Sequence, residues 1–224
     1  RKIIMHVTVK NLLKIEENVK KYLSTNINTP KHPKVIAVSK TFKIDHIEPL
    51  INHGHLDFGE NKVQEAIEKW SKIKEEKQNI KLHLIGRLQS NKVKVAVKIF
   101  EYIHSLDSRK LADKISNYQK EFNKEIKIFI QVNIGQEEQK SGIKENELHE
   151  FYEYCKKLKL NIIGLMCIPP FDEDSSKYFI HMKKLSKKFG FKELSMGMSA
   201  DYLKAIENGS TFVRIGTDIF GRRY

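Results

Sequence analysis

A lysine directly follows a short apolar run in the N-terminal part of the chain. Residues 35–42 read VIAVSKTF, so four apolar residues precede Ser39, Lys40 and Thr41. An ammonium group beside a hydrophobic core is costly unless it has a partner or a use. Desolvation lowers the pKa of a lysine, and the neutral amine is the form that condenses with a carbonyl compound. The run therefore predicts a nucleophilic amine at Lys40, the alternative being an ordinary surface lysine.

Two glycine-containing segments near the C-terminus have the composition of phosphate-binding loops. They read SMGMS at 195–199 and RIGTDIFG at 214–221. Ser199, Gly216 and Thr217 can offer backbone N–H groups and hydroxyls to a phosphate at a helix N-terminus. Together with the lysine above, these segments predict a site for a phosphorylated aldehyde that is held as a Schiff base.

The hydropathy pattern predicts a scaffold that would bring these distant segments together. Short apolar, β-branched runs alternate with charged stretches of helical spacing, such as NKVQEAIEKWSKIKEEK. Continuous apolar strands separated by helices are typical of buried parallel strands, and eight such units close into a (β/α)8 barrel. The predicted strands cover residues 35–39, 56–60, 82–86, 102–107, 126–134, 162–168, 193–197 and 212–216.

The predicted fold is therefore α/β, a single-domain (β/α)8 TIM barrel over residues 1–224 with an extra N-terminal helix at about residues 5–24. No linker or shift in composition marks a domain boundary. Active sites of TIM barrels lie at the C-terminal ends of the strands, and phosphate groups often bind after strands 7 and 8. We therefore expect Lys40 and the two glycine-containing segments to face one cavity.

The order and spacing of the motifs resemble a known family. The motifs are VIAVSKTF, DFGENKVQE, LHLIGRLQSNK, IHSLDS, FIQVNI, GLMCIPP and LSMGMSADYLKAIENGSTFVRIGTDIFGRR. They resemble the YggS/PROSC family of pyridoxal 5′-phosphate (PLP) homeostasis proteins, which is similar to the N-terminal barrel of alanine racemase, over about residues 5–223. The resemblance implies a Schiff base between PLP and Lys40 and a phosphate held by the SMGMS segment, which includes Met198, and by the RIGT segment. It also implies buffering or delivery of PLP without efficient catalysis.

Further polar residues extend the predicted PLP site. Arg214 lies two residues before Gly216, so both share one face of the last strand. An arginine at the ring nitrogen would keep that nitrogen unprotonated and weaken the ring as an electron sink; the alternative is an ion pair at the base or rim of the barrel. Asn61 is expected to bond the phenolic oxygen of PLP or else to cap a helix. We expect an accessory contact from Lys140 and a packed core histidine at His83.

A PLP-dependent amino-acid racemase is the alternative function. It would exchange the α-proton of an amino acid between Lys40 and a second base. Alanine racemases take that base, a tyrosine, from an additional domain on the partner subunit. We expect this chain to end with its barrel, which favours the role without efficient catalysis.

Composition bears on partners and location. The formal charge is +13, but only six of the 41 basic residues are arginine and the lysines are scattered, which favours solvated helix faces over a specific nucleic-acid interface. No apolar run approaches the roughly 20 residues of a membrane span.

Cys155 and Cys167 lie in different predicted elements, so we interpret them as structural thiols and expect no metal site. We expect a cytoplasmic monomer whose partners are PLP and apo forms of PLP-dependent enzymes.

Overall fold

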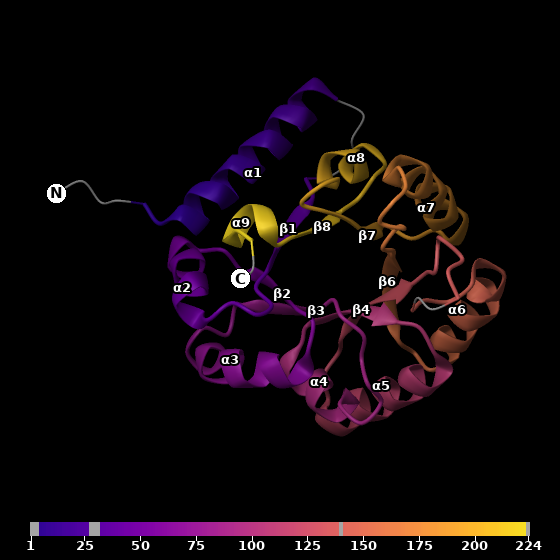
Figure 1. The fold of residues 1–224 in the computed structure, drawn as a ribbon. Coiled ribbons are helices and arrows are strands. Elements are labelled where there is room, and N and C mark those ends of the chain that lie inside the picture. Colours follow the sequence, from indigo (N-terminus) through magenta and orange to yellow (C-terminus); the bar gives the residue numbers. More distant parts are fainter. Residues whose placement is uncertain (1–4, 27–31, 139–140, 223–224) are drawn as a thin grey trace.

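The computed structural model describes residues 5–26, 32–138 and 141–222. Its eight strands pair in sequence order, all parallel, and β8 pairs with β1, so that the sheet closes into a barrel surrounded by helices (Figure 1). The predicted α/β class and TIM-barrel fold are confirmed.

The strands lie close to the predicted ranges. They are β1 (Lys34–Val38), β2 (Asp57–Glu60), β3 (Lys81–Leu84), β4 (Tyr102–Leu106), β5 (Lys127–Gln131), β6 (Asn161–Met166), β7 (Glu193–Met198) and β8 (Phe212–Ile215). Most of their residues are buried, because one face packs on the helices and the other fills the barrel.

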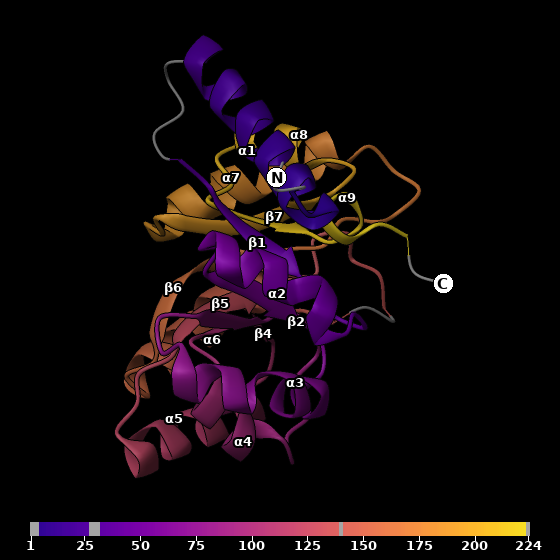
Figure 2. The same ribbon diagram turned by 90° about the vertical axis from the view of Figure 1, so that its left-hand side faces the viewer.

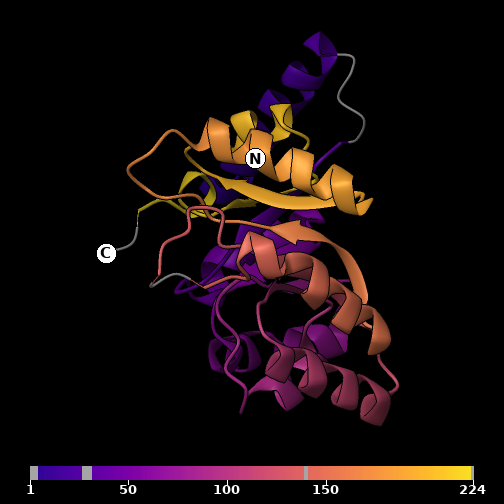
Figure 3. The same cartoon turned by 90° about the vertical axis from the view of Figure 1, so that its right-hand side faces the viewer.

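Helices follow the strands and cover the outside of the barrel. They are α1 (Val7–Thr25), α2 (Ile44–His53), α3 (Val63–Glu76), α4 (Val93–Ile99), α5 (Arg109–Phe122), α6 (Leu148–Lys157) after the short 3-10 helix η1 (Glu145–Glu147), α7 (Ser175–Phe189), α8 (Tyr202–Glu207) and α9 (Thr217–Phe220). Figure 3 shows α6 and α7, in salmon to orange, over one side of the barrel. None of the helices in the described ranges is both long and apolar enough to cross a membrane.

The extra N-terminal helix is present as α1. It lies on the outside of the barrel against α2 and α9 (Figures 1 and 2). Its buried residues Val9, Leu12, Ile15 and Val19 recur every three or four positions, so they form one apolar stripe. This stripe packs into the main hydrophobic core.

The predicted strand at 126–134 is too long, since β5 ends at Gln131. Val132 instead forms an isolated parallel bridge with Ile143, which lies in the loop that follows. Gly142 makes this approach possible, because a Cβ there would lie 2.5 Å from the Asn133 amide nitrogen. The chain therefore leaves the sheet earlier than its apolar residues indicate.

The interior of the barrel is filled by side chains that are unusually rich in rings. His83 and Tyr102 stack with ring centroids 4.2 Å apart, and His104 stacks on Phe129 at 4.4 Å. Phe212 lies against both pairs. This layer separates the two ends of the barrel by a packed core, as expected for the fold.

Candidate functional site

Lys40 lies in the turn after β1, at the carboxyl end of the barrel. β1 is held between β2 and β8, and residues 35–38 are buried. The Ser39 amide donates to the Gly59 carbonyl of β2 at 3.0 Å, which extends the pairing by one residue. Lys40 is half-buried. The structure therefore places the backbone of Lys40 at the mouth of the barrel, where the buried strand β1 anchors it.

Helix α3 holds the residues on both sides of Lys40. Lys69 donates to the Ser39 carbonyl at 2.8 Å, and the Thr41 amide donates to the Glu65 carboxylate. Partial burial opposes the ionisation of Glu65, but its bonds to the Thr41 amide and to Lys69 outweigh burial and lower its pKa. Thr41 has a φ of 70°, a left-handed conformation that is strained for a β-branched residue. The bonds from α3 stabilise the turn in this conformation.

Glu60, the last residue of β2, is the buried centre of the same network. Its Oε1 accepts hydrogen bonds from Ser39 Oγ at 2.7 Å, from Lys69 Nζ at 2.9 Å and from Trp70 Nε1 at 2.9 Å. Its Oε2 has no hydrogen-bond partner in the described part of the chain. A buried carboxylate depends on its paired cation, so Lys69 supports both the turn and the charge beneath it.

We expect Lys69→Met to lower the free energy of unfolding by about 3 kcal/mol, because it leaves the buried Glu60 carboxylate without this ammonium. Urea unfolding would measure the change. Lys72 is exposed on the same helix, and Lys72→Met is the matched control, expected to stay within about 0.5 kcal/mol of the unmodified protein.

A double variant separates charge from packing. Lys69→Met/Glu60→Gln removes both charges of the buried pair and should recover part of the loss, since no fully buried carboxylate is left without its cation. Glu65 also loses Lys69 in both variants, but it is partly exposed and keeps the bond from the Thr41 amide. Equal stability of Lys69→Met and Lys72→Met would contradict the role given to Lys69.

The connections after β7 and β8 meet next to β1. The Asp218 amide, in the first turn of α9, donates to Ser199 Oγ at 3.2 Å. Gly216 lies against Val38 of β1, since a Cβ added to this glycine would lie 3.5 Å from Val38 Cβ. Thr217 is the exposed first residue of α9. The structure thus brings Ser199, Gly216 and Thr217 to the end of the barrel where the lysine lies.

Gly197 and Met198 shape the end of β7. Gly197 has a φ of +92°, and a Cβ there would lie 2.5 Å from Ala205 Cβ, so a side chain would be excluded on both grounds. The Met198 amide donates to Asp201 Oδ1 at 2.7 Å. Because that amide is already bonded, Met198 can contact a ligand chiefly through its side chain, and the residue is 40% exposed.

Arg214 points into the barrel and is 4% exposed. Its Nη1 donates to Ser195 Oγ at 2.6 Å and its Nη2 donates to the Cys167 carbonyl at 2.9 Å. Burial lowers the pKa of Arg214, although an arginine stays protonated at neutral pH. It forms no ion pair with a carboxylate in the described ranges, so the ion-pair alternative is wrong. Two of its five N–H donors are bonded to the protein, which leaves others for a ligand.

Asn61 follows β2, and the helix-capping alternative is wrong for this residue. The N-cap of α3 is Lys62, and no side chain caps that helix end. Asn61 Oδ1 is buried without a hydrogen-bond partner among the described residues. The backbone of Asn61 packs on Gly86, where a Cβ would lie 2.3 Å from the Asn61 carbonyl oxygen. A 180° rotation of the amide would direct its N–H groups, rather than Oδ1, to the same unfilled position.

The remaining predictions concern isolated residues. Lys140 lies outside the described residues. His83 is fully buried, as predicted, but it has polar partners that the strand pattern does not indicate. Cys155 and Cys167 are free thiols whose pKa burial raises to about 12, so both stay protonated. Lys69 was missed, because its spacing is that of an ordinary helix face. Ser195 belongs to the SMGMS segment that was predicted to bind phosphate, but its hydroxyl accepts from Arg214 inside the barrel.

The fold and the residues at the barrel mouth define a class of protein. Residues 11–223 match the family model described as alanine racemase, N-terminal domain. The chain is also 35% identical to the pyridoxal phosphate homeostasis protein of Pasteurella multocida, over 95% of this chain and 96% of that protein. It therefore belongs, within the alanine racemase N-terminal domain class, to the family of pyridoxal phosphate homeostasis proteins.

Solved structures agree with this assignment. PipY of Synechococcus elongatus PCC7942, solved with PLP bound, is 31% identical with a TM-score of 0.79, over 91% of this chain and 99% of that one. Alanine racemase of Clostridium difficile is 16% identical with a TM-score of 0.67, over 92% of this chain and 57% of that one. The second likeness shows a shared fold alone.

Proposed function

We propose that this chain binds PLP at the carboxyl end of its barrel and serves in PLP homeostasis, by buffering or delivering the cofactor. The observation that carries the proposal is the meeting of the β1 turn with the connections after β7 and β8. It brings the half-buried Lys40 to the same end of the barrel as the hydroxyls of Ser199 and Thr217 and the backbone of Gly216. The relatives named for PLP homeostasis and the PLP-bound neighbour support the same ligand.

The residues present fit the chemistry of PLP. The Asn61 amide has a buried polar atom without a partner, and Arg214 keeps unbonded N–H donors inside the barrel. The donors of Ser199, Gly216 and Thr217 suit the phosphate. When bound, PLP supplies an aldehyde that condenses with amines and a ring that can accept electrons.

Each residue then has a role that follows from its chemistry. Lys40 would supply the amine that condenses with the aldehyde. Arg214 would donate to the ring nitrogen and, being always protonated, would not hand a proton over. Asn61 would bond the phenolic oxygen. Because a ring with an unprotonated nitrogen is a poor electron sink, these residues would retain PLP without promoting efficient catalysis at an amino-acid substrate.

The racemase alternative is supported only by a shared fold. A racemase also needs a second base opposite Lys40. Stereoinversion assays with a panel of L-amino acids distinguish the two functions: a homeostasis protein should give no efficient racemisation, and rapid racemisation would favour the alternative.

We further propose that apo forms of PLP-dependent enzymes receive the cofactor, and that the chain acts as a cytoplasmic monomer. All of the proposed PLP contacts come from one chain, so a single copy suffices. The two free thiols are in keeping with a reducing compartment.

A titration of the protein with PLP and with phosphate-free pyridoxal tests this site. Ser199→Ala/Thr217→Ala should weaken PLP by about 1 to 3 kcal/mol, because charge-assisted bonds to the phosphate are lost, and should leave pyridoxal nearly unchanged. Visible absorption would report both affinities. Ser24→Ala/Thr25→Ala, two exposed hydroxyls at the end of α1, is the matched control. Equal losses for both ligands would show that these residues do not bind the phosphate.

A further inference from the structure

Arg214 is one end of a hydrogen-bonded chain that runs through the barrel. Its Nη1 lies 2.6 Å from Ser195 Oγ, which lies 2.8 Å from His104 Nδ1. His104 Nε2 lies 3.0 Å from His83 Nδ1, and His83 Nε2 lies 2.9 Å from Asp57 Oδ1. The five residues come from β8, β7, β4, β3 and β2. No gap interrupts the chain, which we call the Arg214–Asp57 chain.

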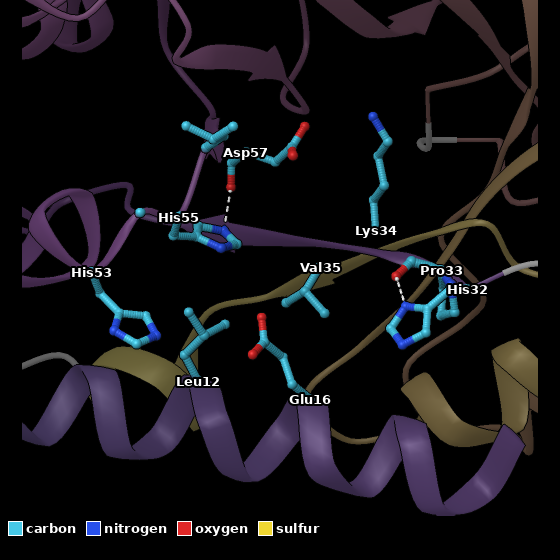
Figure 4. Close-up of a pocket in the computed structure, with 11 residues that line it drawn as sticks. Leu12, Glu16, His32, Pro33, Lys34, Val35, His53, His55 and Asp57 are labelled. Carbon is cyan, nitrogen blue, oxygen red and sulfur yellow. Dashed lines mark hydrogen bonds between the residues drawn. The ribbon is translucent and has the colours of Figure 1, made fainter. Parts of the chain in front are cut away.

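The two ends of the Arg214–Asp57 chain differ in surroundings. Arg214 is buried below the mouth, whereas Asp57 is the first residue of β2, at the amino end of the barrel. Asp57, His55 and Lys34 line a pocket of about 370 Å³. Figure 4 shows these side chains in close-up. His55 Nε2 donates to the Asp57 carbonyl at 2.9 Å, and the Asp57 side chain is 17% exposed. The Arg214–Asp57 chain thus links the candidate PLP site to solvent at the opposite end of the barrel.

The chemistry of the end groups orders every proton between them. A guanidinium can only donate, so Ser195 Oγ accepts from Arg214, and an ionised Asp57 can only accept, so His83 Nε2 carries a proton. A neutral His83 then accepts at Nδ1, which requires a proton on His104 Nε2. His104 Nδ1 is left as the acceptor for the Ser195 hydroxyl. All four bonds are satisfied with both imidazoles neutral in the Nε2–H tautomer.

Protonation of either imidazole would break this order. A proton added to His83 Nδ1 would face the N–H at His104 Nε2. A proton added instead to His104 Nδ1 would face the hydroxyl hydrogen of Ser195. Burial lowers the pKa of His83 despite Asp57, and burial together with His83 and Arg214 holds the pKa of His104 well below its usual value. The charged or titratable groups facing the pair are Asp57, Lys34, Glu101, Arg214 and Tyr102.

We propose that Ser195, His104, His83 and Asp57 are positioning residues that fix the orientation of Arg214 toward the ring nitrogen of PLP, through one ordered set of donors. The proposal rests on the proposed function for the ligand, but the proton order belongs to the protein alone. Ser195 and the Cys167 carbonyl together fix two guanidinium nitrogens, so the plane of the group is set. Loss of the Arg214–Asp57 chain would let the plane of the guanidinium rotate.

The order of the protons in the Arg214–Asp57 chain can be tested on the whole protein without PLP. Long-range proton–nitrogen NMR of the ¹⁵N-histidine-labelled protein at neutral pH should show His83 and His104 as neutral Nε2–H tautomers, with signals assigned from His83→Gln and His104→Gln. An Nδ1–H tautomer or an imidazolium at either residue would overturn the ordered chain.

The positioning role can be tested with PLP and its carbocyclic analogue, in which a C–H replaces the ring nitrogen. Ser195→Ala and His104→Leu should weaken PLP by on the order of fivefold to tenfold, the loss of about one hydrogen bond, and leave the analogue within about twofold. His104→Gln keeps a donor and an acceptor and should restore part of the PLP affinity. Ser116→Ala, which removes another buried serine hydrogen bond, is the matched control.

The outcomes separate the two proposals. Equal weakening of PLP and the analogue would overturn positioning through the ring nitrogen, and Ser195→Ala keeps this test decisive if His104→Leu fails to fold. If the unmodified protein bound neither ligand, the proposed function would fail, and the NMR tautomers would still decide the proton order.

Discussion

Replacement of Lys40 by alanine is expected to abolish covalent PLP binding, the largest effect expected of a single substitution in this chain. The amine in the turn after β1 is the proposed attachment point, whereas the donors of Ser199, Gly216 and Thr217 are proposed to bind only the phosphate. The unmodified protein should be yellow with PLP, and borohydride reduction followed by peptide mapping should place the pyridoxyl group on Lys40. Lys40→Ala should lose both the absorption band and the label.

The matched control for this experiment is Lys43→Ala. Lys43 is an exposed lysine three residues away, so its loss should change neither the absorption nor the labelled peptide. Residual non-covalent PLP in Lys40→Ala is expected, because the phosphate donors remain. A label found mainly on another lysine, or an unchanged absorption band in Lys40→Ala, would refute the assignment of Lys40.

The barrel could be predicted because its strands carry the local signal of burial on both faces. Runs such as 35–39 and 212–216 are short and rich in apolar and β-branched residues, and short runs of this kind between helical stretches are typical of buried parallel strands. The alternation of strands and helices implies a helix between the strands at 82–86 and 102–107, but residues 93–99, which form α4, read VKVAVKI and lack helical spacing. This sequence alternates with the period of a strand and is rich in valine, and only packing against the barrel makes it helical.

The residues of the candidate site could be predicted only where the sequence at the end of a strand is itself distinctive. Lys40 and the glycine-containing segments can be found from local sequence and the barrel topology. Asn61 could be found, but its role could not be separated from helix capping until α3 was seen to begin after Lys62. The partners of Arg214 could not be predicted, because they depend on which of several inward-facing strand residues lie at the same height in the barrel.

Acid should destabilise this protein through His83 and His104, well above the pH range in which carboxylates titrate. Both imidazoles are buried and have a lowered pKa in the folded protein, whereas in the unfolded chain their pKa is about 6.5. Below that value the unfolded state binds more protons, so the free energy of unfolding falls as the pH falls. Between about pH 7.5 and about pH 5 the loss should reach up to about 2 kcal/mol for each histidine.

Urea unfolding at a series of pH values measures this loss. Burial also lowers the pKa of His55, so His104→Gln should remove about a third to a half of the pH dependence, whatever its effect on stability at neutral pH. His46 is exposed, so His46→Gln should keep the slope of the unmodified protein. Asp57 does not interfere with this measurement. Burial would raise the pKa of Asp57, but its bond to His83 outweighs burial and the pKa is lowered. Its contribution to the free energy of unfolding is therefore lost only below about pH 4. The same slope in His104→Gln and in the unmodified protein would mean that His104 is not held neutral, and the ordered proton arrangement between Arg214 and Asp57 would then lose its physical basis.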